Sequence, residues 1–264
     1  MEDSAALVRF YDDAYTQEPA AAALYARWRA LGALGKADHV IALCARAGIG
    51  TDGHGAGDHG AGGRAFKTLE VGCGDGALLC ELHRRDFGGV LSGVEITEAA
   101  VAIARTRPQI DSVELYDGLH LPSADGAYEL GVLSHVLEHV PDPVALLKEV
   151  ARACHAVIVE VPLEANWSAR RAGKREHAAE VGHLQRLDRQ AVREIVARAG
   201  LSIAAELDDP LPLQVHRFFA QTPSQRLAAN AKWAARAGLH RLAPALARRT
   251  FTVHYACLCL PPGA

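Results

Sequence analysis

The segment Glu70-Val71-Gly72-Cys73-Gly74-Asp75-Gly76 decides the fold of this chain. It ends a short apolar run over 67–72, KTLEVG, and it is followed at 77–85 by ALLCELHRR, which has the pattern of a helix. Glycines lack a Cβ, so the backbone of such a loop can approach a ligand closely. The N-terminus of the next helix adds unpaired N–H groups and the positive end of the helix dipole. The segment therefore predicts a strand, a ligand-binding loop and a helix.

The alternation of strand and helix patterns continues on the C-terminal side of this segment. Amphipathic stretches between short apolar runs predict helices, with Thr97, Asp142 and Asp188 as N-caps. Strands that alternate with helices favour a doubly wound, mostly parallel α/β sheet. Together with 67–72, seven strands are predicted, the others lying at 89–96, 112–117, 127–134, 156–162, 201–207 and 250–260.

Segments outside this alternation suggest the domain organisation. Residues 1–47 predict an N-terminal helical cap, because apolar residues recur there at helical spacing. Residues 48–64, GIGTDGHGAGDHGAGGR, are too rich in glycine to fold alone and predict a flexible loop. We therefore expect one α/β domain over 65–264, with a helical insertion at about 222–249 before the last strand.

Composition narrows the classes of function. The net charge of −3 gives no electrostatic footprint for nucleic acid. No run approaches the roughly 18 apolar residues of a membrane span, and the acidic N-terminus has no signal-peptide pattern. We therefore expect a cytoplasmic protein without membrane or nucleic-acid partners. The six cysteines are scattered and are expected to be reduced, with Cys257 and Cys259 on one face of a strand.

Carboxylates stand at three successive strand ends. Glu70 precedes the first glycine by two positions, Glu95 ends the next strand, and Asp117 ends the third. Ligands of an open parallel sheet bind at these carboxyl ends. A carboxylate at Glu70 can face a cationic amino group, one at Glu95 can accept both ribose hydroxyls, and one at Asp117 can accept a bond from an adenine amino group. Gly72, Gly74 and Ala77 also fit a dinucleotide fingerprint, so a nicotinamide enzyme is the competing interpretation.

Longer motifs extend this pattern over roughly residues 65–205. LEVGCGDG at 69–76, GVEIT at 93–97 and YDGLHLPSADGAYELGVLSHVLEHVPDP at 116–143 occur in this order. They resemble the successive motifs of class I S-adenosylmethionine-dependent methyltransferases, above all the branch that acts on small metabolites and sugars. The resemblance implies a Rossmann-like fold with a seven-stranded sheet whose final strand is antiparallel. RFYDDAYTQEP at 9–19 also resembles, more weakly, the aromatic segment before the core of many members.

The resemblance implies a cofactor, S-adenosyl-L-methionine, and a set of residues that hold it. They are Glu70, Gly72, Gly74 and Gly76 for the methionine portion, Glu95 and Ile96 for ribose and adenine, Asp117 and Gly118 for the adenine edge, and Ser134 and His135 for the methionine side. The chain departs from the family pattern at Glu129, where many members carry aspartate. That position is structural in the family, so the departure leaves the implied activity unchanged.

Transfer to a hydroxyl also needs a base, and histidine suits that role near neutral pH. His135 and His139 lie in SHVLEHV, and on a helical turn their i, i+4 spacing places them on one face. His183 lies in the long connection after the fifth strand, which covers the substrate in the family. Packing is as good an explanation of His139 as catalysis, and His135 can simply contact the methionine portion. Glu160 and Glu164 can orient a base or bind sugar hydroxyls.

Other residues have weaker functional interpretations. Trp167 can stack on a sugar ring or pack. Asp208, Asp209 and His216 can assemble metal ligands, but an acidic loop end is favoured, so we predict no metal ligand and leave Mg²⁺ as an unpredicted option. The insertion carries five arginines that can bind an acidic substrate or pack as a lid, although a solvated helix face is the default interpretation. They are Arg226, Arg236, Arg241, Arg248 and Arg249.

The leading hypothesis is an O-methyltransferase of a small-molecule acceptor, preferably a sugar or glycoside. The same cofactor with a nitrogen or carbon acceptor is the first alternative. A nicotinamide oxidoreductase and a binding protein without turnover are the others. The exposed helical additions permit a homodimer without requiring one.

Overall fold

The computed structural model of the chain describes residues 15–16, 18–50 and 66–262. Seven strands form one sheet in the order β3-β2-β1-β4-β5-β7-β6. They are β1 (Lys67–Val71), β2 (Val90–Glu95), β3 (Ser112–Leu115), β4 (Tyr128–Ser134), β5 (Cys154–Pro162), β6 (Ser202–Asp209) and β7 (His254–Leu260). Neighbours among β1 to β5 pair in parallel, whereas β7 runs antiparallel to β5 and β6. The expected sheet with an antiparallel final strand is confirmed.

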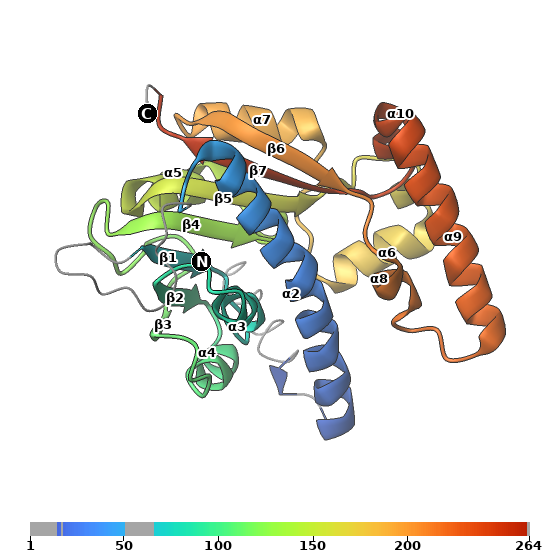
Figure 1. Cartoon of the computed structure of the whole chain (residues 1–264), viewed down its shortest axis with the longest axis horizontal. Helices are drawn as coiled ribbons and strands as arrows, with labels where there is room; N and C mark the ends of the chain where they lie inside the picture. Colours follow the sequence, from blue (N-terminus) through green and yellow to red (C-terminus); the bar gives the residue numbers. More distant parts are fainter. Residues whose placement is uncertain (1–14, 17, 51–65, 263–264) are drawn as a thin grey trace.

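Helices cover both faces of this sheet (Figure 1). Those in the described residues are α2 (Pro19–Ala47), α3 (Ala77–Arg84), α4 (Glu98–Ala104), α5 (Pro143–Ala153), α6 (Ala172–Glu180), α7 (Arg189–Arg198), α8 (Leu213–Arg217), α9 (Pro223–Leu242) and α10 (Pro244–Thr250), with 3-10 turns η1 (Leu137–His139) and η2 (Ser168–Arg170). The apolar sides of α2, α3 and α4 share one core with the sheet. Those of α5 and α7 share the other.

The central strands supply both cores through their alternating side chains. On β5, Val157 and Val159 face α5 and α7, and Ile158 faces α2 and α3. All three are at most 1% exposed, which explains the unbroken apolar sequence of this strand. On β7 the two cysteines share one face, as expected, with 3.7 Å between the Sγ atoms of Cys257 and Cys259. All six cysteines are free.

Two of the three predicted N-caps form as expected. Asp142 accepts hydrogen bonds from the backbone N–H groups of Val144 and Ala145 at the start of α5, and Asp188 accepts one from Ala191 at the start of α7. Thr97 occupies the N-cap position of α4 but forms no side-chain cap bond. Its backbone N–H instead donates to the buried carboxylate of Glu95, 3.2 Å away.

The N-terminal and C-terminal additions are helical. Helix α2 lies within the predicted N-terminal cap. Residues 1–14, 17 and 51–65 lie outside the described residues, so the cap over 1–47, the Gly-rich loop and the boundary at residue 65 stay predictions. The insertion is observed as α9 and α10, preceded by the short α8. Thr222 and Gln225 form a capping box at the start of α9. Within the described part of the chain, none of the helices combines the length and apolarity needed to cross a membrane.

Candidate active site

A cavity of about 1980 Å³ lies at the carboxyl ends of the central strands. Its wall includes Gly72 after β1, Glu95 at the end of β2, Ser134 at the end of β4 and Pro162 at the end of β5. Helices α2, α6, α8 and α9 contribute the remaining sides. Pockets for one small ligand usually measure roughly 300–1,000 Å³. The cavity therefore has room for a cofactor and an acceptor together.

The glycine loop has the backbone geometry that its sequence requires. Gly72, Gly74 and Gly76 have φ values of 71°, 54° and 75°, in the left-handed region that side chains disfavour. A Cβ on Gly74 would lie 2.6 Å from the hydroxyl of Tyr15, a residue of the aromatic segment noted in the sequence. The backbone N–H groups of Gly72 and Cys73 donate to the carbonyl of Val94, which fixes the loop against β2. The loop is therefore a preformed cradle.

Glu70 places a buried carboxyl group beside this cradle. The residue is 4% exposed, and its Oε2 has no hydrogen-bond partner among the described residues. Burial raises the pKa of Glu70 to about 8, although the charge of Lys36 opposes this. A cationic group of a ligand would donate a hydrogen bond to the unpaired oxygen of Glu70. Its positive charge would also favour the ionised carboxylate over the protonated form. This fits the ammonium group of S-adenosylmethionine.

Glu95 and Asp117 differ in how far their oxygens are already used. Glu95 is 7% exposed and accepts backbone hydrogen bonds from Gly74 and Ile96, at 2.9 and 2.7 Å. Asp117 is exposed, and its oxygens bind the backbone N–H groups of Leu119 and His120 and the ring of His120. Glu95 thus shapes the cradle as well as facing the cavity, and Asp117 closes its own turn. Both residues line the cavity, as do Ile96 and Gly118.

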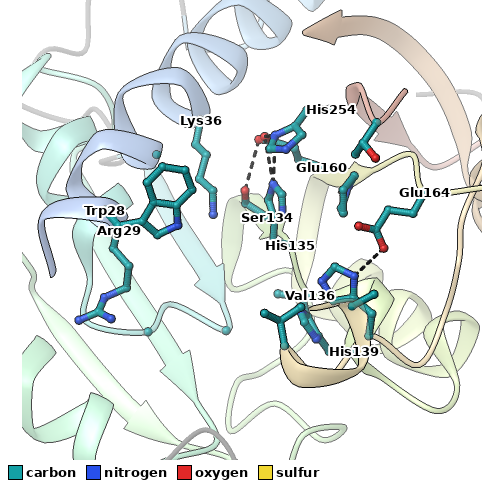
Figure 2. Close-up of a pocket in the computed structure, with 18 of the residues that line it drawn as sticks. Trp28, Arg29, Lys36, Ser134, His135, Val136, His139, Glu160, Glu164 and His254 are labelled. Atoms are coloured by element: carbon teal, nitrogen blue, oxygen red, sulfur yellow. Dashed lines mark hydrogen bonds and ion pairs between the residues drawn. The ribbon is translucent and has the colours of Figure 1, made fainter. Parts of the chain in front are cut away.

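An ion pair that the sequence did not predict ties α2 to the loop. Asp75 is 2% exposed, and its Oδ2 accepts from Arg29 Nε at 3.0 Å and from Arg107 Nη2 at 3.4 Å. Trp28 precedes Arg29 on α2 and lines the cavity (Figure 2). Asp75 lay within the glycine segment, but nothing in the sequence named its partners, because they lie 46 and 32 residues away.

His135 does not lie on the helical turn that would place it on one face with His139, so that expectation was wrong. It follows β4 with a φ of 61°, and the short 3-10 turn η1 begins two residues later. Its ring packs on that of His254 from β7, with ring centroids 4.5 Å apart. Glu160 is 1% exposed, and its Oε1 lies 3.7 Å from His135 Nε2 and 3.5 Å from His254 Nδ1 (Figure 2). Burial alone would raise the pKa of Glu160, but contacts with His135, His254 and His39 hold it well below its usual range.

His39 extends this group of charges toward the sheet edge. Its Nδ1 lies 3.3 Å from Glu160 Oε1, and its Nε2 lies 3.4 Å from Asp209 Oδ2. Burial lowers the pKa of His39, but the two carboxylates overcome this effect and raise the pKa to about 9. His39, Asp209 and His254 belong to α2, β6 and β7, so only the tertiary fold unites them with Glu160.

His139 and His183 form a second histidine pair on the cavity wall. Their ring centroids are 4.7 Å apart. His183 Nδ1 lies 2.7 Å from Glu164 Oε2, whereas His139 Nδ1 binds the carbonyl of Gly182 at 3.1 Å. Burial lowers the pKa of His139. The structure therefore brings Glu164 to His183, while a catalytic role for this pair stays a prediction.

The structure also places the residues that had weaker functional interpretations. Trp167 is 74% exposed and does not line the cavity, so it neither packs nor reaches an acceptor there. Asp208 pairs with Arg248, whereas Asp209 pairs with His39, so these carboxylates do not converge with His216 on a metal. Of the five arginines noted in the insertion, Arg236 alone lines the cavity, and it donates to the carbonyl of Thr252.

The fold and the cradle define a Rossmann-like methyltransferase. The family model described as methyltransferase domain matches residues 30–206, and the chain belongs to this family. Family and cradle together define an enzyme that uses S-adenosylmethionine as its methyl donor.

Among similar proteins of known function is a ubiquinone biosynthesis O-methyltransferase of Acinetobacter baumannii, 33% identical over 108 residues. The match covers 38% of this chain and 43% of that protein, so it spans less than half of the relative.

Solved structures share the fold at low sequence identity. A geranyl diphosphate C-methyltransferase from Streptomyces coelicolor, in complex with S-adenosyl-L-homocysteine, has a TM-score of 0.55 and 17% identity, over 75% of this chain and 74% of that one. A phosphoethanolamine N-methyltransferase from Haemonchus contortus has a TM-score of 0.54 and 12% identity, over 77% and 50%. Their acceptors differ, so the fold leaves the acceptor open.

Proposed function

We propose that the protein methylates a hydroxyl group of a small metabolite, with a sugar or glycoside as the preferred class, and that His183 is the base. The observation that carries this proposal is the pair formed by His183 and Glu164 on the cavity wall. A neutral histidine that donates through Nδ1 to a carboxylate has its lone pair on Nε2, where it can accept a proton. The sequence relatives named for O-methylation support the choice of an oxygen acceptor.

The reaction divides between the cofactor and the chain. When bound, S-adenosylmethionine supplies an activated methyl group on a positively charged sulfur. Glu70 and the glycine loop orient the donor, while His183 takes the proton that the acceptor hydroxyl loses. Glu164 holds the ring of His183 in the required tautomer. Alignment in such a site corresponds to effective concentrations of roughly 10⁵–10⁸ M, so positioning outweighs the base in rate.

The side of the cavity formed by α6 and its neighbours favours a polar acceptor. Arg171, Lys174, Glu180 and Arg186 line it close in sequence to His183. Trp28 offers an aromatic face from α2. Hydrogen-bonding side chains with an aromatic surface suit a sugar ring, which has polar edges and apolar faces.

The test is turnover of the His183→Ala variant against a panel of glycosides, phenols and amines. Removal of a general base should lower kcat about 10²–10⁴-fold, while the Kd for S-adenosylhomocysteine stays unchanged. Glu164→Gln should lower kcat less, because it weakens the orientation and keeps the base. The control is His83→Ala, because His83 is an exposed histidine of α3 that does not line the cavity. Full activity of His183→Ala would overturn the role of His183 as the base, and methylation of amines alone would overturn the proposal in favour of a nitrogen acceptor.

A further inference from the structure

Three side chains from separate strands converge at the inner wall of the cavity. We call His135, Glu160 and His254 the Glu160 triad; they lie just after β4, on β5 and on β7. His135 Nε2 lies 3.3 Å from His254 Nδ1 and 3.7 Å from Glu160 Oε1, and His254 Nδ1 lies 3.5 Å from the same oxygen. Three potential ligand atoms thus form a nearly equilateral triangle.

The oxygen at one corner of this triangle has no proper donor. Glu160 is 1% exposed, and its Oε1 has no hydrogen-bond partner among the described residues despite the imidazole nitrogens around it. Its other oxygen, Oε2, accepts from Ser134 Oγ at 3.3 Å. A buried carboxylate oxygen without an aligned donor is costly. The ring of His39, whose Nδ1 lies 3.3 Å from this oxygen, brings charge close to it but forms no aligned hydrogen bond.

The spacing and chemistry of the triad match a metal site. Ligands about 2.0–2.1 Å from a tetrahedral ion lie about 3.3–3.4 Å from one another, close to the three distances of the triangle. Two imidazoles and one carboxylate suit Zn²⁺ and related first-row cations better than Mg²⁺, which prefers oxygen ligands. We propose that His135, Glu160 and His254 bind a divalent transition-metal ion, with Zn²⁺ as the reference cation.

The surroundings of the triad agree with this assignment. His135 Nδ1 lies 3.3 Å from Glu138 Oε1, so a carboxylate orients the imidazole from behind, as is usual for metal-binding histidines. Glu138 is also 1% exposed, so two buried carboxylates flank the histidines. Lys36 points into the same space (Figure 2). A divalent cation would satisfy Glu160 Oε1, which accepts no hydrogen bond from the described residues.

The metal site has an open side toward the acceptor. The side chains of His135 and His254 are 23% and 18% exposed, and all three members of the triad line the cavity. Three protein ligands with one open position are typical of catalytic metal sites. Resting on the proposed function, we assign that position to an oxygen next to the methylated hydroxyl, as in a vicinal diol. The hydroxyl proton still passes to His183, and the new O–C bond forms as the S–C bond breaks.

A second group with metal-like spacing, Glu138, His139 and His183, does not carry the same inference. Its member His183 is the base of the proposed function, and a metal bound at Nε2 would occupy the lone pair that accepts the proton. The two histidine groups share no member, so they can be tested separately.

The test is metal binding by the purified full chain after treatment with a chelator, at pH 8 so that protons compete little for imidazole. Co²⁺ is titrated first, because its visible absorption reports coordination geometry, and Zn²⁺ is then used to displace it. One Co²⁺ per chain with a tetrahedral spectrum is expected. His254→Ala and Glu160→Gln should abolish that spectrum, and Glu138→Gln should weaken binding about 10–100-fold. The control is His155→Ala, since His155 is an exposed histidine of the same strand as Glu160.

The outcomes separate this proposal from the proposed function. Absence of a tetrahedral spectrum at millimolar Co²⁺, or an unchanged spectrum in both His254→Ala and Glu160→Gln, would overturn the metal site. Circular dichroism and S-adenosylhomocysteine affinity identify any variant that fails to fold. If His254→Ala or Glu160→Gln fails to fold, the metal affinity of Glu138→Gln tests the proposal instead. A metal spectrum in a chain that methylates no hydroxyl would reject the proposed function while the metal site stands.

Discussion

At the scale of single residues, Glu70 shows how burial sets the chemistry of the cradle. Its carboxyl group lies among Asp75 and Glu95, whose charges add to the effect of burial and raise its pKa to about 8. The ordinary value is 4.5, so the folded chain binds this proton more tightly than the unfolded chain. Stability is therefore lost as pH rises from about 4.5 to about 8. A cationic group bound beside Glu70 would offset this loss, because it favours the ionised carboxylate.

We predict that binding of S-adenosylhomocysteine at pH 7 releases about one proton, because a bound ammonium favours the ionised form of Glu70. The affinity should then rise between pH 7 and pH 8. Titration calorimetry in phosphate and in Tris measures the release as a difference in binding enthalpy.

Glu70→Gln is the matched control, since it keeps the shape and removes the proton. The variant should bind more weakly, show equal enthalpies in the two buffers, and lose less stability than the parent as pH rises from 5 to 8. Equal enthalpies in the parent protein would contradict the prediction.

At the scale of elements, α7 and α9 both begin with an N-cap, but the two caps differ in how much they contribute to the stability of the fold. Both helices begin at a side-chain cap, Asp188 for α7 and Thr222 for α9. Helix α7 buries Val192, Ile195 and Val196 against the sheet, whereas α9 has no buried residue. Most of the stability of a helix in a protein comes from such packing. Loss of the cap on α7 should therefore affect the global free energy of unfolding more than loss of the cap on α9.

We predict that Asp188→Ala lowers the free energy of unfolding by about 0.5–2 kcal/mol, the usual cost of a lost N-cap. Thr222→Ala should cost clearly less, because α9 can fray without opening the core. Urea unfolding gives the midpoint and the slope m for both variants. An equal loss in the two, at constant m, would show that α9 unfolds together with the core.

At the scale of the whole molecule, the cavity depends on segments far apart in the chain. Helix α2 supplies His39, β5 supplies Glu160 and β7 supplies His254. Because β7 lies between β5 and β6 and runs antiparallel to both, its first residue, His254, lies at the cavity end of the sheet. A ligand that fills the cavity should therefore stabilise the whole fold.

We predict that S-adenosylhomocysteine at 100 times its Kd raises the free energy of unfolding by about 2.7 kcal/mol. For a chain of this size that corresponds to roughly 5–10 °C in Tm. NADH at the same concentration should leave Tm unchanged, which distinguishes the methyltransferase from the dinucleotide interpretation. Stabilisation by NADH and none by S-adenosylhomocysteine, in a thermal-shift measurement, would reject the assigned cofactor.

The sequence predicted the sheet because local signals agreed with one another. Apolar runs marked all seven strands, and Asp142 and Asp188 capped the helices that they were expected to cap. The glycine loop and Glu95 were predicted from spacing, because φ values and strand ends are local properties. SHVLEHV was misjudged, since its helical spacing was overridden by the left-handed backbone of His135.

What the sequence by itself determined is the class of protein: an α/β sheet, a glycine cradle and acidic residues at the strand ends. These depend on periodicity, backbone conformation and order along the chain. Only the tertiary structure decided which histidines act together, since His39 and His254 join Glu160 from helices and strands more than 90 residues away. Pairing across a sheet leaves no periodic trace in the sequence. The proposed base and the proposed metal site therefore depend on the tertiary fold.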